Sequence, residues 1–177
     1  MMSEYIKEIN EKMTKSLGKV NPNALPKLTK VVLNYRVADG RDSQENLAAA
    51  EKELMAISGQ KPRLSKAKKS IAAFKLREGE PLAYSVTLRG TRMYDFIYKL
   101  FNIVLPRLRD FKGLPQTSFD NQGNYSLTIR DQTYFPEVNL DLVNKIRSVQ
   151  VTMSISASSI EESKMLLSTL GFPFEKN

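Results

Sequence analysis

The sequence contains no cysteine and no histidine. Without cysteine the chain has no disulfide, no thiolate zinc site and no cysteine nucleophile, and this composition suits a reducing compartment. Without histidine it lacks the most common general base and the usual transition-metal ligand. Ser-His-Asp hydrolases are therefore excluded, and most classes of metalloenzyme are disfavoured.

Other absences limit the function further. The eight glycines are scattered, and no Walker or dinucleotide-binding pattern is present. No window approaches the roughly 18 apolar residues of a membrane span, and the N-terminal segment is charged and amphipathic rather than typical of a signal peptide. We expect a soluble protein that is not exported, is not an enzyme and uses no cofactor.

Five acidic residues are the only candidates for acid–base or magnesium chemistry. Each lies beside turn residues or basic neighbours, which is more typical of solvated loop carboxylates than of a catalytic pair. The five are Asp110, Asp120, Asp131, Glu137 and Asp141.

Composition favours one domain with an anionic partner. At 177 residues and 41% hydrophobic content, the chain can bury a core without disulfides or metals. The 27 Lys and Arg residues exceed the 19 Asp and Glu residues, which gives a net charge of +8. Such an excess indicates binding to a polyanion.

Most of this charge lies between Gln60 and Arg77, a stretch without any acidic residue. Its cations repel one another unless a polyanion neutralises them, although a merely solvated basic face is the simpler alternative. Small and apolar residues between the cations favour close approach to a nucleic acid, and Gly79 and Pro81 form a turn after it. We interpret the stretch as a strand or tight segment followed by a protruding loop. Its cations are Lys61, Arg63, Lys66, Lys68, Lys69, Lys75 and Arg77.

Apolar residues at helical spacing predict four helices. The first spans 4–17 between Ser3 and Gly18, and the second spans 42–57 with a capping box of Asp42 and Glu45. The third begins at Thr91 and ends near Pro106, and the last runs from near Ser158, with Glu161 in the capping-box position, to Gly171.

Alternating residues predict strands over 29–36, 82–89, 125–130 and 148–156. Each buries one face only, which predicts an α+β fold: an antiparallel sheet with helices packed on one face, an open polar sheet face and a protruding basic loop. We predict one domain over 1–177, with an N-terminal helix in 1–20 and the loop at 69–82. Many RNA-binding modules use such an open face. Its polar side includes Asn34 and Arg36 on one strand and Thr87 and Arg89 on another.

Several stretches, taken together and in order, resemble a known family. They are KVVLN (30–34), ISGQKPRLSKAKKSIAAFKLREGEP (57–81), VTLRGTRMYDF (86–96), LPRLRDFKGL (105–114), FDNQGNYSL (119–127), FPE (135–137) and GFPF (171–174). From about Asn21 to Phe174 the chain resembles the bacterial L5 family of large-subunit ribosomal proteins, the 5S-rRNA-binding proteins of the central protuberance.

The resemblance implies a structural constituent of the large ribosomal subunit, located in the cytoplasm, that binds 5S rRNA and helps attach it in the central protuberance. It implies hydrogen bonds to that RNA from Asn34, Gln60 and Thr87. It also implies that the loop Lys69–Leu82 reaches the P-site tRNA and the bridge to a protein of the small-subunit head. The candidates for those contacts are Ser70, Phe74, Lys75 and Arg77. Further implied partners are 23S rRNA and neighbouring large-subunit proteins.

The chain also departs from the family pattern. Arg36 and Ala38 stand where the family usually has glycines, and Ala83 replaces another. The motif FDNQGNY has lost one basic residue.

We expect cations to supply affinity through phosphates, while the polar trio Asn34, Gln60 and Thr87 selects the RNA. The phosphate candidates are Arg36, Lys61, Arg63, Lys66, Lys68, Lys69 and Arg89. Two alternatives remain open: a basic module that docks on an acidic protein or an anionic membrane, and a nucleic-acid enzyme that uses loop carboxylates.

Overall fold

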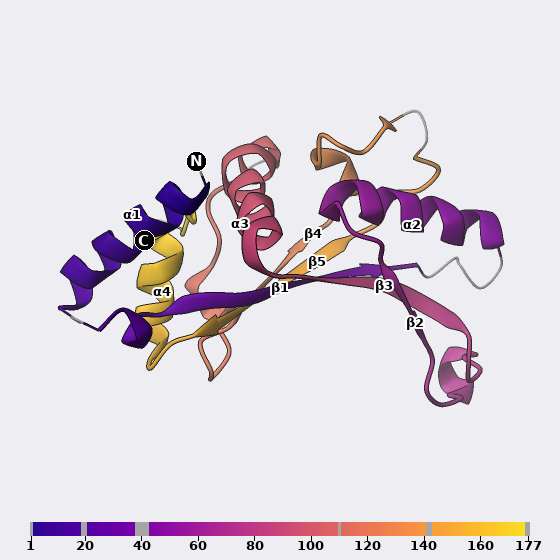
Figure 1. Ribbon diagram of the computed structural model, residues 1–177. Coiled ribbons are helices and arrows are strands. Elements are labelled where there is room, and N and C mark those ends of the chain that lie inside the picture. Colours follow the sequence, from indigo (N-terminus) through magenta and orange to yellow (C-terminus); the bar gives the residue numbers. More distant parts are fainter. Residues whose placement is uncertain (1, 19–20, 38–42, 110, 141–142, 176–177) are drawn as a thin grey trace. The chain divides into compact units, whose positions relative to one another are not determined.

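The computed structural model describes residues 2–18, 21–37, 43–109, 111–140 and 143–175 (Figure 1). These residues include the helices α1 (Met2–Leu17), α2 (Gln44–Ser58), α3 (Gly90–Lys99) and α4 (Ile160–Thr169). They also include the strands β1 (Lys27–Arg36), β2 (Arg63–Lys66), β3 (Pro81–Leu88), β4 (Tyr125–Ile129) and β5 (Val149–Ser156). The strands form an antiparallel sheet in the order β2-β3-β1-β5-β4, so the predicted α+β class is confirmed.

The chain groups into two compact units, which are described in turn. The first comprises Met1–Val31, Arg89–Leu127 and Thr152–Asn177, and the second comprises Val32–Leu88 and Thr128–Val151. The assignment of 1–177 to a single domain stays a prediction.

In the first unit, α1 packs against α3 and α4. Ile9 and Met13 on α1 are buried, as the helical spacing predicts, and the Thr169 hydroxyl of α4 donates to Met13 Sδ at 3.4 Å. An aromatic cluster completes this core, with Tyr125 and Phe172 edge to face at 4.8 Å between ring centroids. The other members of the cluster are Phe101, Phe119 and Phe174.

The helix boundaries differ from the prediction at several N-termini. Helix α1 begins at Met2, two residues before the predicted start, and α3 begins at Gly90, so Thr91 lies inside it. On α4 the cap is Ser159, whose hydroxyl accepts from Glu162 N at 3.3 Å, one residue later than predicted. The prediction was wrong there because two Ser-x-x-Glu patterns overlap, Ser158 with Glu161 and Ser159 with Glu162.

The C-terminal stops agree better with the sequence. Gly18 follows the last residue of α1 with φ +62°, and Gly59 caps α2 with φ +65°. Helix α3 continues through a π-turn at Leu100–Val104 into a short 3-10 turn that contains Pro106. At the start of α2, Ser43 is the N-cap and accepts from Asn46 N at 3.3 Å. The predicted cap Asp42 lies outside the described residues.

In the second unit, α2 lies along one face of the strands (Figure 1). Strands β2 and β3 form an antiparallel hairpin in which Arg63 is opposite Ser85 and Leu64 is opposite Tyr84. The register then shifts between Ser65 and Lys66, because Leu82 on β3 is an extra residue between the partners Ala83 and Pro81, as in a β-bulge. This hairpin presents the basic stretch that dominates the sequence.

Candidate nucleic-acid interface

The strands of the second unit have one apolar and one polar face. On β1, Leu33 and Tyr35 are buried beneath α2, whereas Asn34 is half-buried and Arg36 is exposed on the opposite face. The same alternation holds on β3, where the buried set is Tyr84, Val86 and Leu88. We call the side turned away from α2 the polar face. It comprises Asn34, Arg36, Arg63, Ser85, Thr87 and Gln150.

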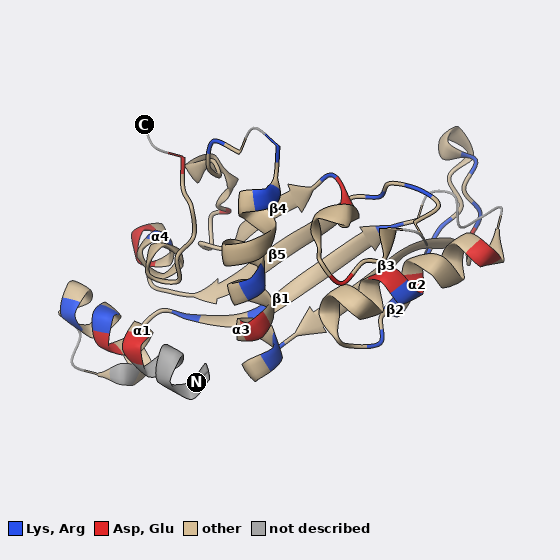
Figure 2. Ribbon diagram, turned by 90° about the horizontal axis from the view of Figure 1, so that it is seen from above, with Lys and Arg blue, Asp and Glu red and all other residues tan. Residues whose placement is uncertain are grey.

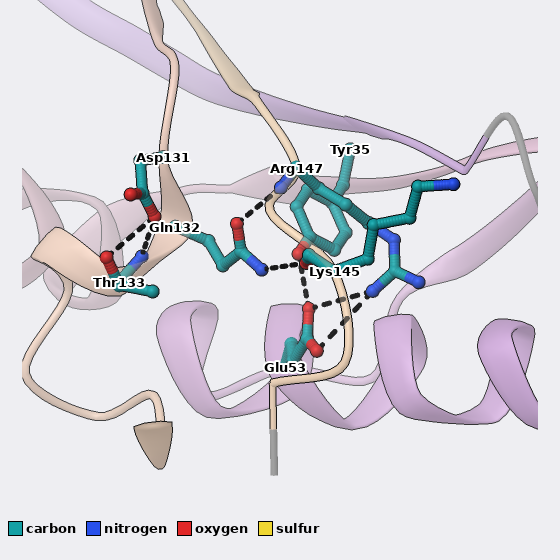
Figure 3. A network of polar contacts seen from close by, with 7 residues as sticks. All are labelled: Tyr35, Glu53, Asp131, Gln132, Thr133, Lys145 and Arg147. Carbon is teal, nitrogen blue, oxygen red and sulfur yellow. Dashed lines mark hydrogen bonds and ion pairs between the residues drawn. The ribbon is translucent and has the colours of Figure 1, made fainter. Parts of the chain in front are cut away.

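A buried polar network supports this platform from the helix side (Figure 3). The Tyr35 hydroxyl donates to Glu53 on α2, and Arg147 Nη1 lies 3.4 Å from Glu53 Oε2. Gln132 joins the network because its Oε1 accepts from Arg147 N at 2.5 Å and its Nε2 donates to Lys145 O at 2.7 Å. The network therefore ties β1 and α2 to the segment that precedes β5.

Burial is the main reason that the pKa of Tyr35 lies above its usual value of 10, and the Glu53 carboxylate adds to the shift. The phenol stays neutral in the folded protein and acts as a hydrogen-bond donor. Since Tyr35 adjoins Asn34 on β1, its anchoring also fixes the strand that carries Asn34.

The predicted polar trio lies in this unit, and the side chains of Asn34 and Gln60 have hydrogen-bond partners. Asn34 Nδ2 donates to Gln150 Oε1 on β5 at 3.5 Å. Gln60, in the turn after α2, donates from Nε2 to the Thr87 carbonyl oxygen at 3.5 Å. The Ser58 hydroxyl accepts from Gln60 N at 3.3 Å and donates to Gln60 O at 3.0 Å, which holds the turn in place. Gln60 and Thr87 are thus brought together, although 27 positions separate them.

Cations border the trio in the same unit. Arg63 shares the face of Ser85 because the two are opposite each other in the β2–β3 ladder. Arg36 is exposed at the end of β1, and Lys61 and Lys66 are exposed on either side of Arg63 in the chain. Long cationic side chains around short polar ones suit a ligand with a charged backbone and hydrogen-bonding edges.

Residues 67–80, which we call the hairpin tip, connect β2 to β3. Its base is closed by backbone bonds from Ala67 N to Glu80 O at 2.8 Å and from Gly79 N to Ala67 O at 3.0 Å. Within it Ile71 pairs with Leu76 around a 3-10 turn. Phe74 is 73% exposed there, and Lys75, with φ +49°, is the one non-glycine residue of the described chain with positive φ.

The remaining predicted contacts of this segment are also exposed. The Ser70 hydroxyl accepts from Glu78 N at 2.9 Å, so this residue also stabilises the turn. Figure 2 marks the lysines and arginines in blue; those exposed on the hairpin tip are Lys68, Lys69, Lys75 and Arg77.

Arg89 belongs to the first unit. It is exposed immediately before α3, and its Nη1 donates to the Thr29 carbonyl oxygen at 3.4 Å. All the other candidates for RNA contacts belong to the second unit, and Arg89 alone among these candidates belongs to the first.

Sequence reasoning missed Gln150 as a site residue. Its place on the polar side of 148–156 is visible from the alternation, but that β5 is the neighbour of β1 is not. Finding Gln150 would have required the order of the strands in the sheet, and the alternation of residues within one strand does not reveal that order.

Two of the acidic candidates, Asp120 and Asp131, stabilise local turns, and Glu137 is exposed. Asp120 accepts from Gln122 N, Asn124 N and the Asn124 side chain within its own turn, and the side-chain bond from Asn124 holds the pKa of Asp120 below its usual value. Asp131 caps a short turn through Thr133 N at 2.8 Å. Asp110 and Asp141 lie outside the described residues.

The described residues contain no group of three acidic side chains arranged to hold a metal ion. None of the helices described here is long and apolar enough to cross a membrane.

Two family models match the chain. Residues 21–77 match "Ribosomal protein L5", and residues 81–174 match the model of the C-terminus of the same ribosomal family. The sequences of curated relatives align with this chain over 176 residues, which is 99% of this chain and 98% of each relative. The large ribosomal subunit protein uL5 of Dictyoglomus turgidum is 46% identical, and those of Lactobacillus johnsonii and Streptococcus sanguinis are 47% identical. The chain therefore belongs to the ribosomal protein L5 family, and it is a structural, non-enzymatic component of the large subunit of the cytoplasmic ribosome.

Proposed function

We propose that the polar face of the second unit binds 5S rRNA and helps attach it in the central protuberance of the large subunit. The observation that carries the proposal is the pairing of Gln60 with Thr87 in the unit that also holds Asn34, beside strand faces turned away from α2 and bordered by cations. Family membership supplies the class of RNA, because relatives along nearly the whole chain are large-subunit ribosomal proteins.

The two kinds of side chain have different tasks in this proposal. Phosphate contacts supply affinity that falls with salt and carries little sequence information. They come from Arg36, Lys61, Arg63, Lys66, Lys68, Lys69 and Arg89. Asn34 and Thr87 on the strands and Gln60 in the turn after α2 select the RNA through base edges and 2′-hydroxyls.

The hairpin tip contacts the P-site tRNA and a protein of the small-subunit head in the same proposal. Its exposed aromatic Phe74 offers a stacking or apolar surface, and Lys75 and Arg77 offer charges for phosphates. Ser70 holds the turn through its bond from Glu78 N. Contacts with 23S rRNA and neighbouring large-subunit proteins complete the set of partners.

The decisive experiment compares binding of the purified protein to 5S rRNA and to a scrambled RNA of equal length across a salt series. Preference for 5S rRNA that persists as salt rises is the expected result, because hydrogen-bond and shape recognition are less sensitive to counterions than phosphate contacts. Equal and steeply salt-dependent binding to both RNAs would contradict the proposal.

A further inference from the structure

Two amides on neighbouring strands determine the hydrogen-bonding pattern of the polar face. Asn34 lies on β1 and Gln150 on the adjacent β5, and both side chains are on the side turned away from α2. Asn34 Nδ2 donates to Gln150 Oε1 at 3.5 Å. Among the described residues, neither side chain makes another hydrogen bond.

This bond orients both amides. A primary amide has its oxygen and nitrogen on opposite sides of the same carbon, so engaging one atom turns the other away. Asn34 directs its nitrogen towards Gln150, which leaves Oδ1 as an acceptor for a ligand. Gln150 directs its oxygen towards Asn34, which leaves Nε2 as a donor.

Gln60 follows the same rule on the other side of β1. Its Nε2 donates to the Thr87 carbonyl oxygen, so its Oε1 is also left as an acceptor. Both amides of the polar trio therefore have an oxygen that can accept from the ligand, beside the second N–H that each amide nitrogen retains. RNA groups that can donate to these oxygens are the exocyclic amines of the bases and the 2′-hydroxyls.

Resting on the proposed binding of 5S rRNA, we propose that Gln150 is a positioning residue for this face. It holds the Asn34 amide with Oδ1 outward, so that Asn34 and Gln60 accept hydrogen bonds from base amines or 2′-hydroxyls of the RNA. The face thereby recognises RNA donors, and the specificity of Asn34 depends on a residue of another strand.

A double-mutant cycle tests the dependence. Gln150→Met keeps the length of the side chain and removes both polar atoms, and we expect about a tenfold loss of affinity for 5S rRNA with none for scrambled RNA. Asn34→Leu should reduce the affinity by a similar factor. The double variant should bind 5S rRNA no less tightly than the single variant with the larger loss of affinity. Gln44→Met, at the exposed start of α2, is the matched control and should bind as the parent does.

An analogue experiment on the parent protein tests the donor chemistry. Inosine in place of guanosine removes the N2 amine, and a 2′-deoxynucleotide removes the hydroxyl, whereas 7-deazaguanosine removes an acceptor. In 5S rRNA with each analogue placed at random, donor-lacking nucleotides should be depleted from the bound fraction at one or a few positions. Depletion at one of these positions should disappear with Asn34→Leu.

The outcomes separate this inference from the proposed function. If Asn34→Leu and Thr87→Ala lose 5S rRNA affinity while Gln150→Met binds as the parent does, the inference is overturned and the proposed function stands. Additive losses, or depletion by 7-deazaguanosine alone, would overturn it as well. If the parent protein binds 5S rRNA no better than scrambled RNA, both the proposed function and this inference are contradicted. If a variant does not fold, as shown by the absence of a cooperative unfolding transition, the nucleotide-analogue experiment on the parent protein tests the inference instead.

Discussion

On the polar face, the candidates for selecting the RNA are the short side chains of Asn34 and Thr87 on two strands; Asn34, and Gln60 in the turn after α2, each have a hydrogen-bonding neighbour. On the hairpin tip the candidate contacts are longer side chains in a turn, where Phe74 is 73% exposed. The polar face is also anchored beneath by Glu53 and Arg147. Fixed groups favour discrimination between ligands, whereas exposed long side chains favour adaptable contact with charged or apolar surfaces. Under the proposed function, one unit thus combines a selective surface with an adaptable one.

The largest effect should come from removing the support of the polar face. Glu53→Ala leaves the buried Arg147 guanidinium and the Tyr35 hydroxyl without their carboxylate, and we expect a loss of about 3–5 kcal/mol in the free energy of unfolding. Chemical denaturation measures it. Glu45→Ala removes an exposed glutamate from the first turn of α2 and should cost only about 0.5 kcal/mol. Equal losses in both variants would show that the network does not support the face.

The next largest effect should come from Thr87, and it distinguishes selection of 5S rRNA from general affinity for RNA. Thr87→Ala should cost about 1–3 kcal/mol of binding free energy for 5S rRNA and little for scrambled RNA, because it removes a hydroxyl from the polar face. Filter binding at fixed salt measures both. Thr117→Ala, exposed in a short turn of the first unit, is the control. An equal loss on both RNAs would contradict a role in selection.

Alkaline pH should weaken the anchor of β1. Because the pKa of Tyr35 is raised in the folded protein, the unfolded chain loses the phenol proton first, and stability falls as pH rises above the usual value of 10. By about pH 11 this single group should cost about 1.4 kcal/mol relative to neutral pH. Tyr35→Phe should show a correspondingly shallower decline in denaturation experiments. Parallel declines for the two proteins would exclude Tyr35 as the source.

A lysine of the hairpin should act on all RNAs alike. Lys66→Ala removes one exposed cation, so it should weaken binding to 5S rRNA and to scrambled RNA by a similar factor. It should also lower the slope of log affinity against log salt by about one unit or less. The slope of log affinity against log salt measures it. A loss confined to 5S rRNA would place Lys66 with the selective residues instead.

The smallest effect on 5S rRNA should come from the hairpin tip. Phe74→Ala removes a side chain that is 73% exposed, so the stability and 5S rRNA affinity of the free protein should stay within about 0.5 kcal/mol of the parent. Reconstituted large subunits that carry the variant should bind P-site tRNA or small subunits less tightly. A large loss of 5S rRNA binding would remove the distinction between the two surfaces.

The sequence predicts the faces of the strands better than the contacts between elements. The alternation of Tyr84, Val86 and Leu88 is a local property, and the structure confirms it. The buried role of Glu53 went unpredicted, although it shares the apolar stripe of Ala50, Leu54 and Ile57 at helical spacing. A glutamate on such a stripe needs a partner, and that partner, Arg147, lies 94 positions away.

Other features were beyond local reasoning for similar physical reasons. The π-turn after Lys99 depends on how α3 meets the core, not on residue propensity. Gln150 requires the order of the strands, because only the proximity of β5 to β1 makes it a neighbour of Asn34. The trio itself came from the family resemblance, and the structure adds that Gln60 and Thr87 lie within hydrogen-bonding distance.

The bulge between Ser65 and Lys66 has a consequence for how this hairpin can evolve. Successive residues of a strand point to opposite faces, so inserting or deleting one residue inverts every side chain beyond it. At the bulge, the extra residue already absorbs one such inversion. Because Lys66 and Pro81 form the last pair of the ladder, a change of length in the hairpin tip shifts no other pair and should be tolerated in related chains, whereas a one-residue change within Arg63–Ser65 should not.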